Sequence, residues 1–262
     1  MDKKEFLLHS IIKAYIEHLE PIGSSQLKSM YDITYSPATI RGYFKKLGDE
    51  GFLAQEHVSS GRTPTTEALK LYWNEKIDFK LDFVDEKAIE YFAHEIGLSV
   101  FLQEQKSDVL KNILNVENRY MILEFSSFAI TVKFTDPLYR FLNDMVGLEL
   151  THIVNISKQV GAIEIYEKVS QYLQNKNFHI YNTKEFFSLA LNYNFDERSI
   201  NSFLKGRILD SIDEGLYFDN IIPQGYIAIC HNCKIQNIDT KMLVVGELSK
   251  DYEYFYNKIS MV

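Results

Sequence analysis

The stretch that decides the fold is Tyr35-Ser-Pro-Ala-Thr-Ile-Arg-Gly-Tyr-Phe-Lys-Lys-Leu-Gly-Asp-Glu-Gly-Phe-Leu53. Ser36 is a favourable N-cap, because its hydroxyl can accept a hydrogen bond from a free backbone N–H in the first turn. Pro37 follows at the first helical position, where its missing donor costs nothing. Gly51 can adopt the left-handed conformation that ends a helix. Apolar residues recur at helical spacing and predict one narrow buried stripe: Ile40, Phe44 and Leu47.

The face opposite this stripe is small and basic. It carries Ala38, Arg41, Gly42, Lys45 and Lys46. A short helix with one buried stripe and such an outer face fits the major groove of DNA. The alternative is an ordinary amphipathic helix whose lysine side is solvated, and on this helix alone the two interpretations are equally favoured.

The residues before this helix predict two further helices. A broad apolar face over residues 6–19 predicts the first, and Pro21–Gly23 ends it. Ser24 or Ser25 is predicted to cap a short second helix over residues 26–31. Asp32 begins a tight connection into the third helix. Helices joined by such short links are typical of a helix-turn-helix unit.

After Gly51 the hydrophobic period changes. Residues 52–56 predict a short strand, and residues 57–62 predict a turn-rich hairpin tip. Thr63 is predicted to cap the next helix, with Pro64 at its first position. A hairpin in this place is the wing of a winged helix.

Two residues of this predicted wing stand out. Gly61 keeps the tip slim, and Arg62 is placed to reach a phosphate or the narrow minor groove. The alternative for Arg62 is a solvated loop arginine.

Four linked runs in this region resemble the HrcA family, the heat-inducible transcription repressors of bacteria. They match in order and spacing: Pro21–Leu27, Ser36–Arg41, Gly51–Leu53 and Ser60–Thr65. The sequence departs from the family at Gly42, where the family carries Asn. Because an amide can read a base edge and Gly cannot, this departure implies either a closer approach to DNA or reading by DNA shape.

The resemblance implies a negative regulator of heat-shock (chaperone) genes that binds an inverted-repeat operator called CIRCE. It also implies that the chaperonin supports the repressor's active state. One recognition helix covers too few base pairs for selectivity, so we expect a homodimer on half-sites spaced by about one helical turn (~34 Å) or a multiple. The expected DNA-binding residues are Ser24, Ser36, Pro37, Ala38, Thr39, Arg41, Gly42, Lys45, Lys46, Gly61 and Arg62.

Composition sets the limits for the rest of the chain. The 262 residues suggest one large or two modest domains, and 46% hydrophobic residues suffice for a sizeable core. The chain contains no stretch of about 18 uninterrupted apolar residues, so its sequence predicts no membrane span. The start Met1–Phe6 lacks the apolar core of a signal peptide, so we expect a cytoplasmic protein.

The net charge of −8 is unevenly distributed. Residues 1–77 hold ten Lys and Arg against ten Asp and Glu, so the remaining residues carry the whole excess of acid. DNA-binding domains often have a basic excess, and this one does not. We therefore expect modest non-specific affinity, with base and shape contacts carrying more weight.

The second part predicts an α+β domain, with a boundary near Asp78. Expected helices cover residues 85–104, 107–115, 161–174, 186–193, 200–212 and 251–259. Expected strands cover residues 119–125, 128–134, 151–156, 178–181, 226–230 and 241–246. The closing run Gly246–Tyr254 also resembles the family, which implies a GAF-like domain with an inserted dimerisation segment, divergent here near residues 142–193.

No motif predicts an enzyme. The chain lacks a Walker phosphate loop, G-x-G-x-x-G after a strand, H-E-x-x-H and G-x-S-x-G. Cys230-His-Asn-Cys233 offers two thiols and an imidazole, but no second ligand pair is spaced for zinc. A reduced, half-buried strand end is favoured over a metal or redox site, and we expect no cofactor.

Two other functions stay open. One is a winged-helix regulator controlled by a small-molecule effector bound in the second domain. The other is a module that does not bind DNA and uses its winged helix to contact a protein.

Overall fold

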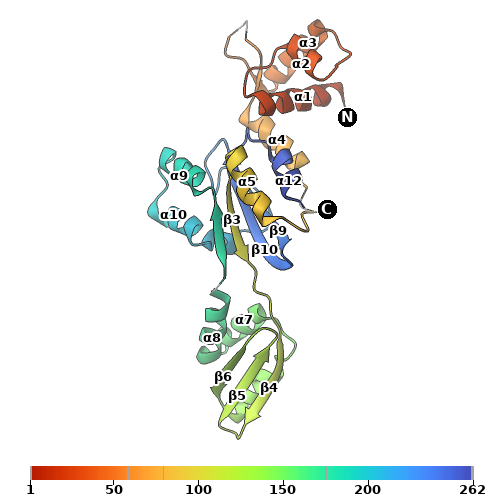
Figure 1. Cartoon of the computed structure of the whole chain (residues 1–262). Helices are drawn as coiled ribbons and strands as arrows, with labels where there is room; N and C mark the ends of the chain where they lie inside the picture. The colour runs from red at the N-terminus through yellow and green to blue at the C-terminus, as the bar shows by residue number, and fades with distance from the viewer. Residues whose placement is uncertain (1, 58–59, 79, 175, 261–262) are drawn as a thin grey trace. The chain divides into compact units, whose positions relative to one another are not determined.

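The computed structural model describes residues 2–57, 60–78, 80–174 and 176–260. The fold is α+β, and the chain forms two compact units. Residues 1–103 and 178–262 form the first unit, and residues 104–177 form the second (Figure 1). Among the described residues, no helix is both long enough and apolar enough to cross a bilayer.

The N-terminal part of the first unit packs three helices against a short hairpin, and we call this assembly the head. Its elements are α1 (Lys3–His18), α2 (Ser24–Met30), α3 (Pro37–Asp49), β1 (Leu53–Ala54) and β2 (Thr63–Pro64). One core unites them, built from Leu7, Ile11, Ile22, Leu27, Ile40, Phe44, Leu47 and Leu53. The predicted buried stripe of α3 is therefore confirmed.

Both ends of α3 follow the sequence prediction. The Ser36 hydroxyl accepts a hydrogen bond from the Thr39 N–H at 3.1 Å. At the other end Gly51 has φ +83°. Its N–H donates to the Gly48 carbonyl at 3.0 Å, and the next N–H, of Phe52, donates to the Leu47 carbonyl at 2.9 Å. These paired bonds satisfy carbonyls that the helix end would otherwise leave open.

The predicted cap of α2 is wrong. Gly23 is the N-cap, and its N–H donates to the Gln26 side chain at 3.2 Å. Ser24 is the first residue of the helix and is buried, and its hydroxyl accepts a hydrogen bond from Arg41 of α3 at 3.3 Å. The serine thus joins two helices instead of capping one.

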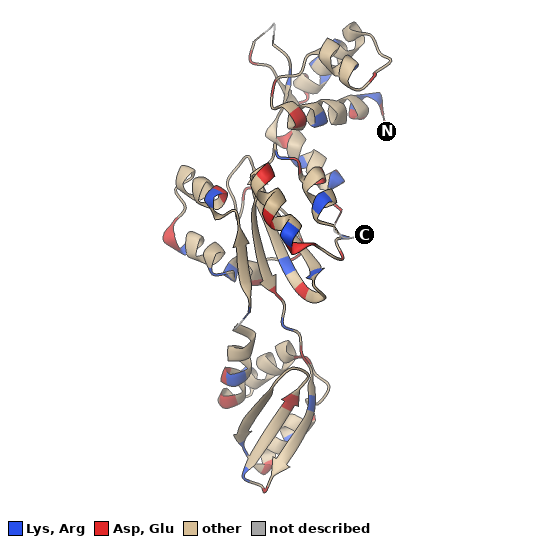
Figure 2. Cartoon of the chain, in the orientation of Figure 1, with Lys and Arg blue, Asp and Glu red and all other residues tan. Residues whose placement is uncertain are grey.

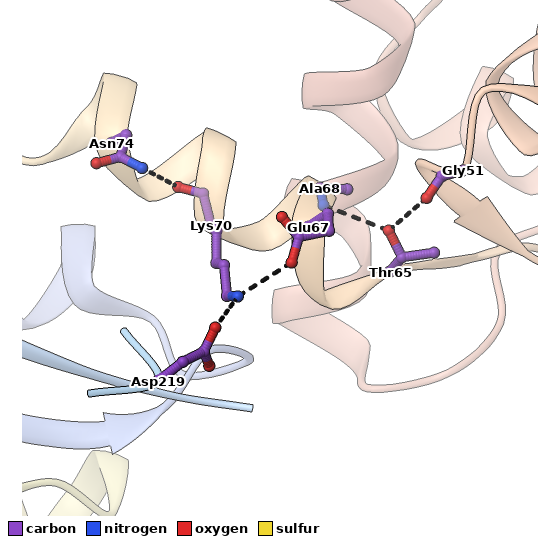
Figure 3. A network of polar contacts seen from close by, with 7 residues as sticks. All are labelled: Gly51, Thr65, Glu67, Ala68, Lys70, Asn74 and Asp219. Carbon is purple, nitrogen blue, oxygen red and sulfur yellow. Dashed lines mark hydrogen bonds and ion pairs between the residues drawn. The ribbon is translucent and has the colours of Figure 1, made fainter. Parts of the chain in front are cut away.

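The predicted cap of the helix after the hairpin is also wrong. Thr63 and Pro64 form β2, in which Pro64 is buried opposite Leu53 of β1, a position that an edge strand tolerates. The helix α4 (Thr66–Lys76) begins two residues later than predicted, with Thr65 as N-cap. The Thr65 hydroxyl accepts from the Ala68 N–H and donates to the Gly51 carbonyl at 2.8 Å (Figure 3).

Residues 57–62 were predicted to form the hairpin tip, but Gly61 and Arg62 do not belong to it. They lie beside the start of α2 instead. The backbone of Arg62 exchanges two hydrogen bonds with Ile22, both 2.9 Å long. A Cβ atom on Gly61 would lie 2.6 Å from backbone atoms of Pro21 and Ile22. Glycine is required by this close approach of two backbones. Residues 58–59 of the expected tip lie outside the described residues.

A five-stranded sheet forms the centre of the first unit, in the order β7-β3-β10-β9-β8. The strands are β3 (Ser99–Glu104), β7 (Phe178–Tyr181), β8 (Gly215–Tyr217), β9 (Tyr226–Ile235) and β10 (Ile238–Glu247). The pairs β3–β7, β9–β10 and β8–β9 are antiparallel.

Helices cover both faces of this sheet (Figure 1). One face packs on α4, α5 (Glu86–Ile96) and α12 (Tyr252–Ile259), and the other on α9 (Thr183–Asn192), α10 (Glu197–Leu204) and α11 (Arg207–Ser211). Burial on both faces explains the continuous apolar runs of β3 and β10.

Two predicted helices of this unit are shorter than expected. The helix predicted over residues 85–104 ends at Gly97 (φ +77°), and its last six residues form β3, the strand between β7 and β10. The helix predicted over residues 200–212 is divided at Gly206 (φ +70°) into α10 and α11. Each break falls at a glycine that adopts the left-handed conformation.

The second unit packs a three-stranded antiparallel sheet against helices. Its strands are β4 (Leu110–Val116), β5 (Tyr120–Phe125) and β6 (Ala129–Lys133), in that order. Its helices are α6 (Asp136–Asn143), α7 (Leu150–Gln159) and α8 (Ile163–Gln174). The predicted hairpin β5–β6 is confirmed.

Two elements of this unit differ from the prediction. Residues 107–115 were expected to be helical, yet most of them form β4, because pairing with β5 places Leu110 and Ile113 on the buried face. Residues 151–156 were expected to be a strand but lie in α7, whose buried residues Leu150, Ile153 and Ser157 recur at helical spacing. In α8 the first residue, Ile163, is exposed, and the buried residues are Ile165 and Val169.

The β5–β6 turn, Ser126-Ser127, is held by Asp108. The carboxylate accepts hydrogen bonds from the Ser126 N–H at 2.6 Å, the Ser127 N–H at 2.9 Å and the Ser127 hydroxyl at 2.5 Å. Burial alone would raise the pKa of Asp108, but the hydrogen bonds from Ser127 and Ser126 outweigh it and lower the pKa to about 2. A weak turn sequence thereby forms a tight hairpin.

Replacing Gly61 with Ala should destabilise the chain by roughly 1–3 kcal/mol, because the new methyl group would overlap the Pro21–Ile22 backbone. Urea denaturation measures this free energy of unfolding. Gly42→Ala is the matched control, since a Cβ there meets nothing within 4 Å and the helix should gain about 0.5–1 kcal/mol. Equal effects of the two substitutions would contradict the assigned role of Gly61.

Replacing Asp108 with Asn should lower the free energy of unfolding by roughly 2 kcal/mol at pH 7, because Asn lacks the negative charge and has only one of the two oxygens that accept hydrogen bonds from Ser126 and Ser127. A depressed pKa stabilises the fold above the ordinary value near 3.8, and this contribution is lost as the pH falls toward 2. The difference between variant and parent should therefore shrink below about pH 4. Urea midpoints of both proteins, with the exposed-site variant Glu167→Gln as control, check this; a difference that stays constant down to pH 2.5 would refute it.

Candidate nucleic-acid interface

A cleft of about 580 Å³ lies between the start of α2, α3 and the chain before β2. It brings together four of the residues expected to bind DNA: Ser24, Arg41, Gly61 and Arg62. Each is positioned by a contact already described, because Ser24 holds the Arg41 side chain and Gly61 allows Arg62 to pair with Ile22. The cleft therefore presents two guanidinium side chains from fixed backbone positions.

The other expected residues lie along α3 and do not line this cleft. Ser36, Ala38, Thr39, Gly42, Lys45 and Lys46 are exposed, and Pro37 is half-buried. The outward side of α3 is thus exposed. A Cβ on Gly42 would meet nothing within 4 Å, so the surface at this position is flat and unobstructed.

Arg41 is the residue that joins the two surfaces. It is exposed on α3, yet its guanidinium reaches across to donate to the Ser24 hydroxyl at 3.3 Å. This hydrogen bond limits the orientations of a long side chain before any partner arrives, which reduces the entropy lost on binding.

The sequence prediction missed several residues that line the cleft. They are Ile22, Gly23, Ser25, Gln26, Phe44, Gln55 and Ser60. Gln55 reaches the Ser60 carbonyl at 2.9 Å and so holds the two arms of the hairpin together. Most of these residues lie inside or beside the four runs quoted above, so the runs themselves were the available signal.

Charge on the head is mixed. Figure 2 shows both signs of charge on its helices. Lys4 of α1 pairs with Glu50 at 2.8 Å, and Lys46 lies over the Tyr43 ring at 5.6 Å. With equal numbers of acidic and basic residues in residues 1–77, attraction to a polyanion comes from local groups and not from net charge.

The cysteine pair does not form a metal site. Cys230 packs with Phe101 and Leu243 on one face of the central sheet, while Cys233 packs with the core on the other face. Burial raises the pKa of the Cys230 thiol to about 11 and that of Cys233 to about 12. Thiols on opposite faces of a strand cannot both bind one ion, and high pKa values disfavour thiolate chemistry.

One other group of possible ligands lies at the surface of the described residues. Glu5, His9 and Glu75 place ligand atoms within 4.8 Å of one another. His9 already contacts Glu75 at 3.0 Å, and Glu5 accepts the Asp2 N–H at 3.1 Å. Such surface clusters are common without an ion, and these contacts account for all three side chains.

The similarity to known proteins covers the whole chain. The family model of the HrcA C-terminal domain matches residues 73–262. The heat-inducible transcription repressor HrcA of Helicobacter pylori is 30% identical over 260 residues, covering 99% of this chain and 95% of the relative. HrcA of Chlamydia trachomatis is 32% identical over 182 residues, covering 66% and 46%. A solved structure of a hypothetical protein is 18% identical with a TM-score of 0.49, covering 98% and 96%.

The family model spans well over half of the chain, and the H. pylori relative is matched almost from end to end. The chain therefore belongs to the HrcA family of heat-inducible transcription repressors, and it is a negative regulator of transcription rather than an enzyme.

Proposed function

We propose that the head is a winged helix-turn-helix that represses heat-shock genes by binding their operator. In this proposal α3 is the recognition helix, and the chain from β1 to β2 is the wing. The observation that carries it is the open outward side of α3, continuous with a cleft that holds Arg41 and Arg62. A helix of this width enters the major groove, and the adjacent arginines reach the phosphates or the minor groove.

The proposed DNA-binding residues fall into three groups, according to where each side chain lies. Ala38, Thr39 and Gly42 face outward with little bulk, so α3 can approach the base edges closely. Arg41, Lys45 and Lys46 supply the positive charge that phosphates require. The remaining residues shape the surface. Ser36 and Pro37 begin α3, Ser24 holds Arg41, and Gly61 allows the close approach of two backbones.

We infer that the repressor acts as a homodimer on an inverted repeat of the CIRCE type. A two-fold dimer matches the symmetry of such an operator. The outer face of the second unit's sheet supports this, because Leu114, Val116 and Tyr120 are 42%, 40% and 48% exposed there on paired strands. Apolar side chains gathered on an open sheet face are typical of an interaction surface.

We propose the same division of the chain as the sequence predicted, with a DNA-binding domain over residues 1–77 and a GAF-like regulatory domain over residues 78–262. The three-layer packing of the five-stranded sheet supports a GAF-like arrangement. The divergent insert, predicted near residues 142–193, is proposed to carry dimer contacts; residues 178–192 of it form β7 and α9 on the central sheet. We further propose that the protein acts in the cytoplasm, where its operator lies.

We propose that the chaperonin supports the active state. The 18 Phe and 17 Tyr residues make the unfolded chain strongly apolar, and the exposed sheet face of the second unit adds to this in a monomer. Such surfaces aggregate or are captured by a chaperone.

Replacing Arg41 or Lys45 with Glu should weaken binding to an inverted-repeat DNA by at least about 100-fold, since each change removes a favourable charge and adds repulsion at the groove. Fluorescence anisotropy with a duplex from upstream of the host's chaperone genes measures the affinity. Lys13→Glu is the control, because Lys13 is exposed on α1 and its change alters net charge equally. Tight binding by the Arg41 variant would refute the assignment of α3 to the groove and favour a protein-contacting module.

Arg62→Ala should weaken binding to the operator and to unrelated DNA by similar factors of roughly tenfold, because a phosphate or minor-groove contact carries little base information. The same anisotropy assay with operator and scrambled duplexes gives the ratio of the two affinities. A large loss of this ratio would place Arg62 among the base-reading residues.

Adding purified chaperonin with ATP to heat-treated protein should raise the fraction that binds operator DNA. The chaperonin would capture apolar surface exposed by heat and return folded chains. Titration of active sites with excess labelled duplex measures this fraction, and chaperonin with a non-hydrolysable ATP analogue is the control. An unchanged fraction would argue against chaperonin dependence.

A further inference from the structure

A second groove, of about 550 Å³, lies in the first unit on the face of the sheet that carries α10. Residues from the end of α9, from α10 and from the loop before β9 line it. Its walls are mainly apolar and aromatic: Tyr193, Phe195, Phe203, Ile221, Ile222 and Pro223. This volume, with such walls, lies within the range that binds small organic molecules.

The polar groups of this groove indicate an uncharged ligand. Its carboxylate, Asp196, already caps α10 by accepting the Ser199 N–H at 2.7 Å. The remaining polar lining consists of amides and hydroxyls, from Asn194, Ser202 and Asn220 among others. These groups suit a small aromatic or aliphatic molecule with one or two hydrogen-bonding atoms.

The loop that forms one wall also holds α4. Asp219 directly precedes the lining residues Asn220–Pro223, and its backbone has φ +57°. Its carboxylate forms an ion pair with Lys70 of α4 (Figure 3). The Lys70 side chain is only 13% exposed, and it also contacts Glu67 at 3.0 Å and lies over the Phe218 ring. The Asp219 side chain is 44% exposed, and the attraction between two opposite charges falls as they move apart.

Helix α4 continues this connection to the head. Five residues before Lys70, the Thr65 hydroxyl caps α4 and donates to the Gly51 carbonyl, where α3 ends (Figure 3). The 219–223 loop thus contacts α4 through the Asp219–Lys70 ion pair, and the N-cap of α4 contacts the chain just after α3 through hydrogen bonds from Thr65 to Gly51 and Phe52.

We propose that this groove binds a small, uncharged apolar molecule and that its occupancy alters α4, and through α4 the DNA-reading helix, by way of the Asp219–Lys70 pair. The effect on DNA affinity rests on the proposed function. Ligand binding and the response of α4 do not.

The first test measures binding of N-phenyl-1-naphthylamine, an uncharged aromatic amine, by its fluorescence in the full chain. We expect saturable binding that Ile221→Trp or Ser202→Trp weakens by at least about tenfold by filling the groove. Ile238→Trp is the control, because Ile238 is 44% exposed at the start of β10 and should leave binding unchanged. Absence of saturable binding, or equal binding by all variants, would overturn the site.

The second test measures amide hydrogen exchange with and without the probe. We expect changed exchange over both 219–223 and 66–76 in the parent, but only over 219–223 in Asp219→Asn and Lys70→Met. Asn tolerates the positive φ of residue 219, and Met keeps the apolar stem of Lys70, so the fold is preserved. No response of α4 in the parent, or the same response in the variants, would overturn the connection.

The same samples are then titrated with operator duplex. A probe-dependent change in affinity that Asp219→Asn abolishes supports the full proposal. If the parent responds in α4 but its DNA affinity is unaffected by the probe, the regulatory part is overturned. If the parent binds no DNA with or without the probe, the proposed function fails while the exchange result still decides the groove and its connection to α4.

Discussion

The structure of the first unit depends on the burial of one indole ring. Trp73, the single tryptophan of the chain, is fully buried on α4, and its N–H donates to the Leu248 carbonyl at 2.8 Å. Its ring meets the Tyr252 ring edge-on, with centroids 5.0 Å apart. A large apolar group whose only donor is satisfied gives both stability and a defined orientation. Thr65 caps α4 and Lys70 lies within it. Burial of Trp73 therefore also fixes the positions from which these two residues make their contacts.

Close backbone contact determines the shape of the head. The two hydrogen bonds between Ile22 and Arg62 join a helix start to the chain before β2, although the residues lie far apart in sequence. Gly61 makes this contact possible, and Arg41 then reaches Ser24 across the same junction. A head without net positive charge thereby gains a locally basic surface whose groups are held in place.

In the second unit, the hairpin turn Ser126-Ser127 has a weaker preference for a tight turn than a pair such as Asn-Gly. The buried Asp108 carboxylate supplies what the turn lacks by accepting two backbone N–H groups. The stacked Phe125, Phe128 and Tyr172 rings cover the same corner. These tertiary contacts thus stabilise a turn that its local sequence favours only weakly.

The sequence by itself determined the features that depend on neighbouring residues. The capped start of α3 at Ser36, its buried stripe and its end at Gly51 are local, and all three are present as predicted. The hairpin β5–β6 and the helix after Asp251 follow from composition and period in the same way. Family membership followed from runs of residues that keep their spacing.

Tertiary structure decided the features in which a segment chooses between partners. Most of residues 107–115 form a strand instead of the predicted helix, and residues 151–156 form a helix instead of the predicted strand. Strand pairing and helix packing outweighed the local preference of each segment. Pro64 lies in a strand instead of a helix, and Ser24 contacts Arg41 instead of capping α2. Gly61 packs closely against the Pro21–Ile22 backbone. None of these outcomes is encoded by nearby residues, because each depends on which distant group occupies the adjoining space, and only the folded chain fixes that.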